Sequence, residues 1–201
     1  KVKFKKFILK PASSGSSNGL VMIKSNRDLL LFFKRLVKFK NSFKKNEQFL
    51  IEEYISGKEL TVSIIKNQLN YKPLEVTEIV SLNKTYDYQA KYTKGFSKHF
   101  IPARITKQNH KQCLDLSLKI NKIFKCNTLS RVDFILSKKE NKIYFLEINS
   151  QPGMTKMSLL PEQATFKKIK FETIVIELIN NSKWIQILIK KKFAFLKIEN
   201  F

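Results

Sequence analysis

Two apolar segments separated by a short polar stretch constrain the fold of this chain more than any other feature. LSRVDFILS (129–137) and KIYFLEIN (142–149) alternate apolar and polar residues, as strands do. KKEN between them is typical of a hairpin turn. We therefore predict an antiparallel hairpin over residues 129–149.

Polar side chains are expected to gather on one face of this hairpin. Because strand side chains alternate in direction, Arg131 and Asp133 share a face, and so do Phe145, Glu147 and Asn149. If the two faces coincide, carboxylate and amide oxygens converge, and Mg²⁺ prefers such ligands. The neighbouring Arg131 would suit a phosphate or a developing oxyanion. A solvent-exposed polar face of an edge hairpin is the alternative.

The rest of the chain alternates further strands with a few helices, so the predicted class is α+β. In the helix expected over 109–126, one stripe contains Cys113, Leu116, Ile120 and either Ile123 or Phe124. The other expected elements are strands over 6–11, 20–24, 49–55, 60–65 and 71–80, helices over 26–39 and within 161–180, and a long polar loop over 83–105.

The formal net charge of +23 is typical of proteins that bind nucleic acid or anionic membranes. The 39 basic residues are 35 Lys and only 4 Arg, spread along the chain, whereas direct base readout favours Arg. We attribute the charge mostly to a coding sequence biased toward A and T, and expect neither a nucleic-acid nor a membrane partner. A basic nucleic-acid-binding module remains the alternative of another class.

Cysteine usage and hydropathy indicate a cytoplasmic protein. Cys113 and Cys126 form no CxxC motif, so we expect reduced thiols. No run of about 18 apolar residues predicts a membrane span, and no signal-peptide pattern is present. The sequence begins KVKFKKFILKP without a Met, close to a predicted strand, so we expect that an upstream part is missing.

Three further segments carry weaker signals. KPASSGSSNG (10–19) offers backbone N–H groups and Lys10 to a phosphate, although it is not a Walker A loop and a flexible turn is the alternative. Glu52 and Glu59 flank a strand end and a glycine, where ordinary surface charge is the alternative. YDYQAKYT places Lys91 between aromatic residues, as in a base-stacking segment or in a lid over a small substrate.

Taken together and in this order, these segments resemble the ATP-grasp superfamily, and within it the D-alanine–D-alanine ligase family. The resemblance runs from about Phe7 to about Asn181 and is carried by LKPASSGSSNG, FLIEEYISGKELTVSI, YDYQAKY, RVDFIL and LEINSQPGMTKMSLLP. It implies an ATP-grasp fold of antiparallel sheets with flanking helices, in two subdomains with ATP between them. Residues 1–56 would be the remainder of the central subdomain, 57–181 the C-terminal catalytic subdomain, and 182–201 a tail of unknown role.

The resemblance also implies a set of ATP-binding residues. Lys10 and Lys91 would bind phosphate, and Glu59 would hold the ribose. Glu52 would sit against adenine, beside the backbone of the next three residues. The remaining members of the set are Ser13, Ser14, Gly15 and Ser17 in the loop that closes over ATP, and Glu53, Tyr54 and Ile55 beside adenine.

Metal and substrate roles follow from the same resemblance. Asp133 and Glu147 would hold one Mg²⁺, Glu147 and Asn149 a second, and Mn²⁺ could replace either. The remaining roles concern the oxyanion, the lid and the second amino acid. They would fall to Arg131 and the Gly153 backbone (oxyanion), Ser16 and Tyr92 (lid partners), and Ser158 and the Leu159 backbone (carboxylate of the second D-alanine).

The implied activity is ATP-dependent ligation of two D-alanines through an acyl phosphate, for peptidoglycan precursor synthesis. The partners would be D-alanine and ATP, with a homodimer expected for the full-length protein. A D-alanine–D-lactate type or another ATP-grasp carboxylate–amine ligase is the alternative. The family's N-terminal domain has no counterpart here, so we predict that the chain alone makes no dipeptide.

Overall fold

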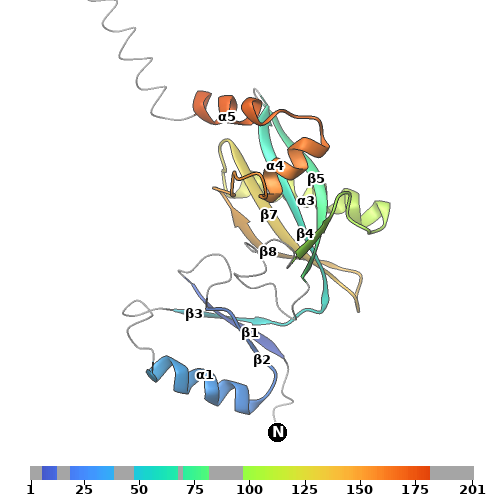
Figure 1. Ribbon diagram of the computed structural model, residues 1–201. Coiled ribbons are helices and arrows are strands. Elements are labelled where there is room, and N and C mark those ends of the chain that lie inside the picture. The colour runs from blue at the N-terminus through green and yellow to red at the C-terminus, as the bar shows by residue number, and fades with distance from the viewer. Residues whose placement is uncertain (1–5, 13–18, 39–47, 68–69, 82–96, 182–201) are drawn as a thin grey trace, which may run out of the picture. The chain divides into compact units, whose positions relative to one another are not determined.

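The computed structural model describes residues 6–12, 19–38, 48–67, 70–81 and 97–181, which lie in two compact units (Figure 1). The first unit falls within residues 1–56 and 80–98, and the second within residues 57–79 and 99–201. Antiparallel sheets with flanking helices confirm the predicted α+β class. Among the described residues, no helix is long and apolar enough to span a membrane.

The first unit is a three-stranded antiparallel sheet in the order β2-β1-β3, covered by helix α1 (Figure 1). Its strands are β1 (Phe7–Pro11), β2 (Val21–Ile23) and β3 (Phe49–Glu53), and α1 spans Asn26–Lys38. The small core joins Leu9, Ile23 and Phe32, so α1 packs on the sheet through one apolar face.

The second unit contains a five-stranded sheet in the order β6-β5-β4-β7-β8. The pairs β4–β5, β4–β7 and β7–β8 are antiparallel, and the predicted hairpin over 129–149 is confirmed as β7–β8. The strands are β4 (Gly57–Asn67), β5 (Asn70–Ser81), β6 (Ser97–Phe100), β7 (Leu129–Ser137) and β8 (Ile143–Asn149).

Helices cover both faces of this sheet. Helix α3 (Lys107–Ile123) packs on the face that carries Leu60, Val62 and Phe134. Helices α4 (Leu159–Phe166) and α5 (Phe171–Asn180) pack on the other face, around Ile65. The apolar β4 residues Leu60, Val62 and Ile64 therefore face one core and Ile65 the other, as the alternation of strand side chains requires.

Several expectations were wrong in detail. The single closing helix within 161–180 is two helices, α4 and α5, and Lys168 between them has a left-handed φ of 59°. The end of the predicted loop over 83–105 forms strand β6. The predicted stripe of the 109–126 helix is confirmed at Cys113, Leu116 and Ile120, which pack on the core, but Ile123 and Phe124 at its end are exposed.

Phe145 does not share the face of Glu147, contrary to the alternation in the sequence. The register pairs Asp133 with Glu147 and then Phe134 with Phe145, so Leu146 is one extra residue on β8. The Phe145 ring contacts those of Phe134 and Phe124, with centroids 6.5 and 6.2 Å apart, on the α3 side of the sheet.

Buried charge in the second unit is paired. Glu78 on β5 is 4% exposed and accepts hydrogen bonds from the Arg104 guanidinium at 2.9 and 3.0 Å and from Lys58 at 3.3 Å. Burial alone would raise the pKa of Glu78, but the bonds from Arg104 and Lys58 outweigh it and hold that pKa below its usual value.

The cysteines are free thiols, as expected. Cys113 lies wholly buried in the core between α3 and the sheet, and burial raises its pKa to about 12. Burial also raises the pKa of the half-buried Cys126. Neither thiol has the depressed pKa that reactive cysteines need.

Candidate active site

Polar side chains lie in two adjacent rows across β4, β7 and β8. Residues paired in the register form the rows, with Thr61, Asp133 and Glu147 in one and Ser63, Arg131 and Asn149 in the other. The two polar faces therefore coincide, and Asp133, Glu147 and Asn149 come together on the face of the sheet that α4 covers.

Asp133 is held by three hydrogen bonds. Arg131, two residues away on β7, donates from Nε to Oδ1 at 2.9 Å and from Nη2 to Oδ2 at 2.8 Å. The Thr61 hydroxyl donates to Oδ1 at 2.6 Å. The side chains of Arg131 and Asp133 are 16% and 17% exposed, so this charge-assisted pair is largely shielded from water.

Glu147 and Asn149 lie at the end of β8, where the chain turns away from the sheet. Glu147 is exposed, and Asn149 is half-buried. The Asn149 side-chain oxygen accepts a hydrogen bond from the Gln151 N–H at 2.9 Å, which closes a turn at the end of the strand. Pro152 follows and prevents β8 from continuing.

Between this turn and α4, Gly153 lies close to Ser158. A Cβ at Gly153 would lie 2.7 Å from the Ser158 Oγ, so only glycine fits without displacing that hydroxyl. Ser158 Oγ accepts the Thr155 N–H at 3.1 Å and lies 2.9 Å from Thr155 Oγ1. Ser158 is the N-cap residue of α4, yet its side chain caps no N–H of the helix. The helix N-terminus, which favours anions, is therefore left without this cap.

In the first unit, two of the residues predicted to bind ATP contact each other. Lys10 on β1 forms an ion pair with Glu52 on β3 at 2.8 Å, with side chains 22% and 40% exposed. Strand β3 ends at Glu53, and the N–H of Tyr54 donates to the Lys6 carbonyl at 3.0 Å. Tyr54 is therefore still bonded to the chain before β1, and Ile55 follows outside any strand.

Glu59 belongs to the second unit. It lies on β4 opposite Ile135, two residues before Thr61, so it shares the face of Asp133. The other predicted site residues lie outside the part of the chain that the structure describes. They are Ser13, Ser14, Gly15, Ser16 and Ser17 in the 13–18 segment, and Lys91 and Tyr92 in the 82–96 segment.

The sequence reasoning missed two side chains that contact this face. Thr61 donates to Asp133, and Gln163 on α4 is a fully buried amide bonded to β4 and β5. The signal for Thr61 was present, because Thr61 and Ser63 interrupt an apolar strand at alternate positions. His99 on β6 lies 2.6 Å through Nδ1 from the Glu162 carboxylate in the first turn of α4.

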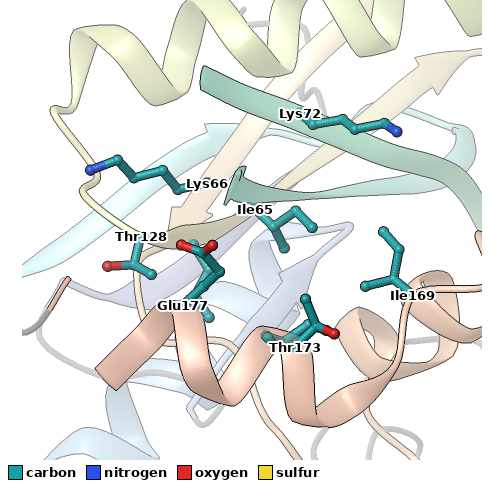
Figure 2. Close-up of a pocket in the computed structure, with 9 residues that line it drawn as sticks. Ile65, Lys66, Lys72, Thr128, Ile169, Thr173 and Glu177 are labelled. Carbon is teal, nitrogen blue, oxygen red and sulfur yellow. The ribbon is translucent and has the colours of Figure 1, made fainter. Parts of the chain in front are cut away.

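A cavity of about 170 Å³ lies elsewhere in the second unit, between the sheet and α5 (Figure 2). Ile65 and Leu129 are paired in the register four residues along the strands from Thr61 and Asp133, or roughly 13 Å away. Lys66 and Lys72 extend in opposite directions in Figure 2, and Lys66 donates to the Asn181 side chain at 2.7 Å. The cavity contains none of the predicted site residues.

The residues on the polar face fit a divalent cation. Within the described residues no three Asp, Glu, His or Cys side chains gather as metal ligands, and the predicted set contains only two carboxylates beside one amide. Asp133 and Glu147 are directly opposite each other, where like charges repel. A hard cation would relieve this repulsion and prefers such oxygen ligands.

The chain is similar to known proteins over most of its length. A family model described as D-ala D-ala ligase C-terminus matches residues 3–180. A D-alanine–D-alanine ligase from Rickettsia typhi is 40% identical over 174 residues, which are 86% of this chain and 51% of that protein. The chain spans about half the length of the curated relatives it matches.

Solved structures of the same name have a similar fold. The crystal structure of a D-alanine–D-alanine ligase from Bacillus anthracis aligns with a TM-score of 0.69 and 27% identity, over 90% of this chain and 55% of that one. A structure of a ligase from the same organism complexed with ATP aligns with a TM-score of 0.64 over 90% of this chain and 51% of that one. At 23% identity, the second likeness concerns the fold alone.

Proposed function

Because this chain belongs to the family described as D-ala D-ala ligase C-terminus, we propose that it is the ATP- and metal-binding part of a D-alanine–D-alanine ligase. The observation that carries the proposal is the pairing of Asp133 and Glu147 across β7 and β8, with Arg131 bonded to Asp133. Two opposed carboxylates and one cation on a half-buried face suit phosphoryl transfer, which needs charge neutralisation more than a nucleophilic side chain.

The proposed reaction has two steps and uses ATP as co-substrate. A carboxylate oxygen of the first D-alanine takes the γ-phosphoryl group of ATP, which leaves an acyl phosphate and ADP. The amine of the second D-alanine then attacks the acyl carbon. The C–N bond forms, inorganic phosphate leaves with the C–O electron pair, and the amine loses a proton.

Residues of the second unit supply the charge and the positioning for the second step. Arg131 is the fixed cation beside the site and stabilises the tetrahedral oxyanion together with the Gly153 N–H. The N-terminus of α4, which the Ser158 side chain leaves uncapped, binds the carboxylate of the second D-alanine through Ser158 and the Leu159 N–H. Holding the amine in this way converts the attack into an effectively unimolecular step.

Asp133 and Glu147 would hold one Mg²⁺, and Glu147 and Asn149 a second. When bound, the ions would neutralise the phosphate oxygens of ATP and of the transferring phosphoryl group. Asp133 keeps its orientation through Arg131 and Thr61, so a ligand oxygen is already directed before ATP arrives.

In the first unit, Lys10 binds ATP phosphate. Its ion pair with Glu52 holds the lysine side chain across β1 and β3 in the absence of nucleotide. Glu52 and the backbone of residues 53–55 contact adenine, and Glu59 on β4 contacts the ribose. The proposal also gives ATP-binding or lid roles to Ser13, Ser14, Gly15, Ser16, Ser17, Lys91 and Tyr92, which lie outside the described residues.

We assign residues 1–56 to the central ATP-grasp subdomain and 57–181 to the C-terminal catalytic subdomain. The full-length protein is a cytoplasmic homodimer that makes a peptidoglycan precursor. This part of the proposal rests on the family and on no contact within the chain.

Calorimetric titration of the 201-residue chain with a non-hydrolysable ATP analogue tests the nucleotide site. Binding should require Mg²⁺, and Asp133→Asn should remove the Mg²⁺-dependent part. Asp115→Asn, which removes one charge from the exposed side of α3, is the matched control and should bind as the parent does. Binding that ignored Mg²⁺ and weakened steeply with salt would instead favour a general polyanion site.

The ligase reaction is tested in the full-length protein by release of ADP and phosphate. Release should require D-alanine and should accompany D-alanyl-D-alanine, identified by mass spectrometry. Equal turnover with L-alanine, or ADP release without any amino acid, would refute the proposed reaction.

A further inference from the structure

Thr61 makes the shortest of the three hydrogen bonds to Asp133. Its side chain is completely buried, and its hydroxyl lies 2.6 Å from Asp133 Oδ1. An ionised carboxylate only accepts hydrogen bonds, so the single Thr61 proton is donated to Asp133. Such charge-assisted O–H···O⁻ bonds are short and strong, and they fix the orientation of the carboxylate.

The two oxygens of Asp133 have unequal surroundings as a result. Oδ1 accepts from both Thr61 and the Arg131 Nε, while Oδ2 accepts only the Arg131 Nη2 among the bonds that hold this carboxylate. Oδ1 is thus occupied on the β4 side. Oδ2, with one donor fewer, is the oxygen through which Asp133 would hold a cation, and Glu147 is the next residue of the row.

Gln163 ties this arrangement to α4. Its amide accepts the Ser63 N–H at 2.8 Å and donates to the Thr61 carbonyl at 3.3 Å and the Thr77 hydroxyl at 2.9 Å. The Ser63 N–H lies where the β4–β5 register shifts, between Val62 and Ile64. Gln163 therefore fills a gap in the sheet from the helix whose first turn follows Ser158.

We propose that Thr61 is a positioning residue for the metal ligand Asp133, and that Gln163 keeps Thr61 in register with the first turn of α4. The inference rests on the proposed function, because it assumes that Asp133 binds a metal. It predicts that the metal site and the site for the second amino acid's carboxylate are coupled through one buried network, Gln163–Thr61–Asp133.

Ser63 offers a matched control on the same strand. Its hydroxyl is also buried and faces the same side as Thr61, but it has no hydrogen-bond partner among the described residues. Removing it deletes a buried hydroxyl without touching Asp133. The comparison of Thr61→Val with Ser63→Ala therefore separates loss of a buried polar group from loss of a bond to the metal ligand.

The test is a titration of the 201-residue chain with Mn²⁺, with free ion measured by electron paramagnetic resonance. Thr61→Val should weaken Mn²⁺ binding by roughly 10- to 100-fold, the usual effect of removing an outer hydrogen-bond partner of a metal ligand. Thr61→Ser, which keeps the hydroxyl, should restore most of the affinity. Ser63→Ala should bind like the parent, and thermal unfolding should show that all three variants fold.

The outcomes separate this inference from the proposed function. If Asp133→Asn loses Mn²⁺ binding while Thr61→Val, folded, binds like the parent, the positioning role of Thr61 is wrong and the metal site stands. If Thr61→Ser binds as weakly as Thr61→Val, the hydroxyl is not what matters, and the inference also fails. If the parent binds no Mn²⁺, or Asp133→Asn binds like the parent, the metal site is wrong and the inference falls with it.

Coupling to α4 is tested in the full-length protein with Gln163→Met. The Michaelis constant for the second D-alanine and the Mn²⁺ affinity should both worsen, since both depend on one network. A variant that is less stable but unchanged in both values would show that Gln163 only supports the fold.

Discussion

Asp133 and Glu147 lie directly opposite each other on the neighbouring antiparallel strands β7 and β8. Like charges at opposed positions cost stability in most sheets. Here Arg131 donates two hydrogen bonds to Asp133, at 2.9 and 2.8 Å. Two opposed carboxylates therefore lie at the place where the proposed function puts a divalent cation.

Glu147→Gln should separate metal binding from stability. Without metal, the change removes a repulsion, so the free energy of unfolding should stay equal or rise by up to about 1 kcal/mol. The affinity for Mn²⁺ should fall, because an amide replaces a carboxylate ligand. Urea unfolding and Mn²⁺ titration of the same preparation measure the two effects. A large loss of stability without metal would contradict the prediction.

Glu78 should make the chain sensitive to acid. Its pKa is held low in the folded state by Arg104 and Lys58, so its contribution to stability is present above the ordinary pKa of 4.5 and is lost as pH falls through the lower folded value. Urea unfolding at several pH values should show Glu78→Gln far less stable than the parent at pH 7. That difference should shrink below about pH 4.5. A difference that stayed constant down to pH 3 would rule out this linkage.

Gly153 and Ser158 should be coupled energetically. An alanine Cβ at Gly153 would approach Ser158 Oγ to 2.7 Å and disturb its bonds to Thr155. Gly153→Ala should therefore destabilise the chain less when Ser158 is already Ala. A double-mutant cycle should give a coupling of about 0.5–3 kcal/mol, the range for residues in contact. Additive effects would mean that the loop moves to accept the new methyl group.

The two thiols should differ in their reaction with iodoacetamide at pH 8. Cys113 is fully buried with a pKa raised to about 12, so it should be alkylated only after unfolding. Cys126, which is half-buried, should be labelled in the folded chain. Mass spectrometry of peptides after timed labelling gives both rates, and equal rates would indicate that α3 opens readily.

The hairpin over 129–149 and its polar face could be predicted because alternation is a local signal. The face of Phe145 could not, since the extra residue Leu146 becomes visible only when β8 is paired with β7. The break between α4 and α5 was hidden for another reason. Lys168 adopts the left-handed conformation that glycine usually marks, and no glycine or proline stands between the two helices.

Contacts between distant residues were the least predictable part of the candidate site. Gln163 bonds to the Thr61 carbonyl across 102 positions of sequence, and nothing around Gln163 distinguishes it from a surface glutamine. Burial of polar residues on the inner face of α3 was equally hard to predict from the sequence. Asn121 is buried, and its side chain accepts a hydrogen bond from the Ser130 hydroxyl on β7 at 2.6 Å. The apolar stripe of the helix does not predict a buried amide at this position.

Leu146 has no partner on β7, so the effect of deleting one residue from β8 depends on where the residue is removed. With Leu146 deleted, Glu147 could still oppose Asp133 and Phe145 could still oppose Phe134, so β8 would lose only its extra residue. With Ile148 deleted instead, and Asn149 still opposite Arg131, Glu147 would fall opposite Val132 and turn into the apolar core. Related sequences can therefore lack one residue before Glu147 without losing the site. The spacing from Glu147 to Asn149, by contrast, must stay the same.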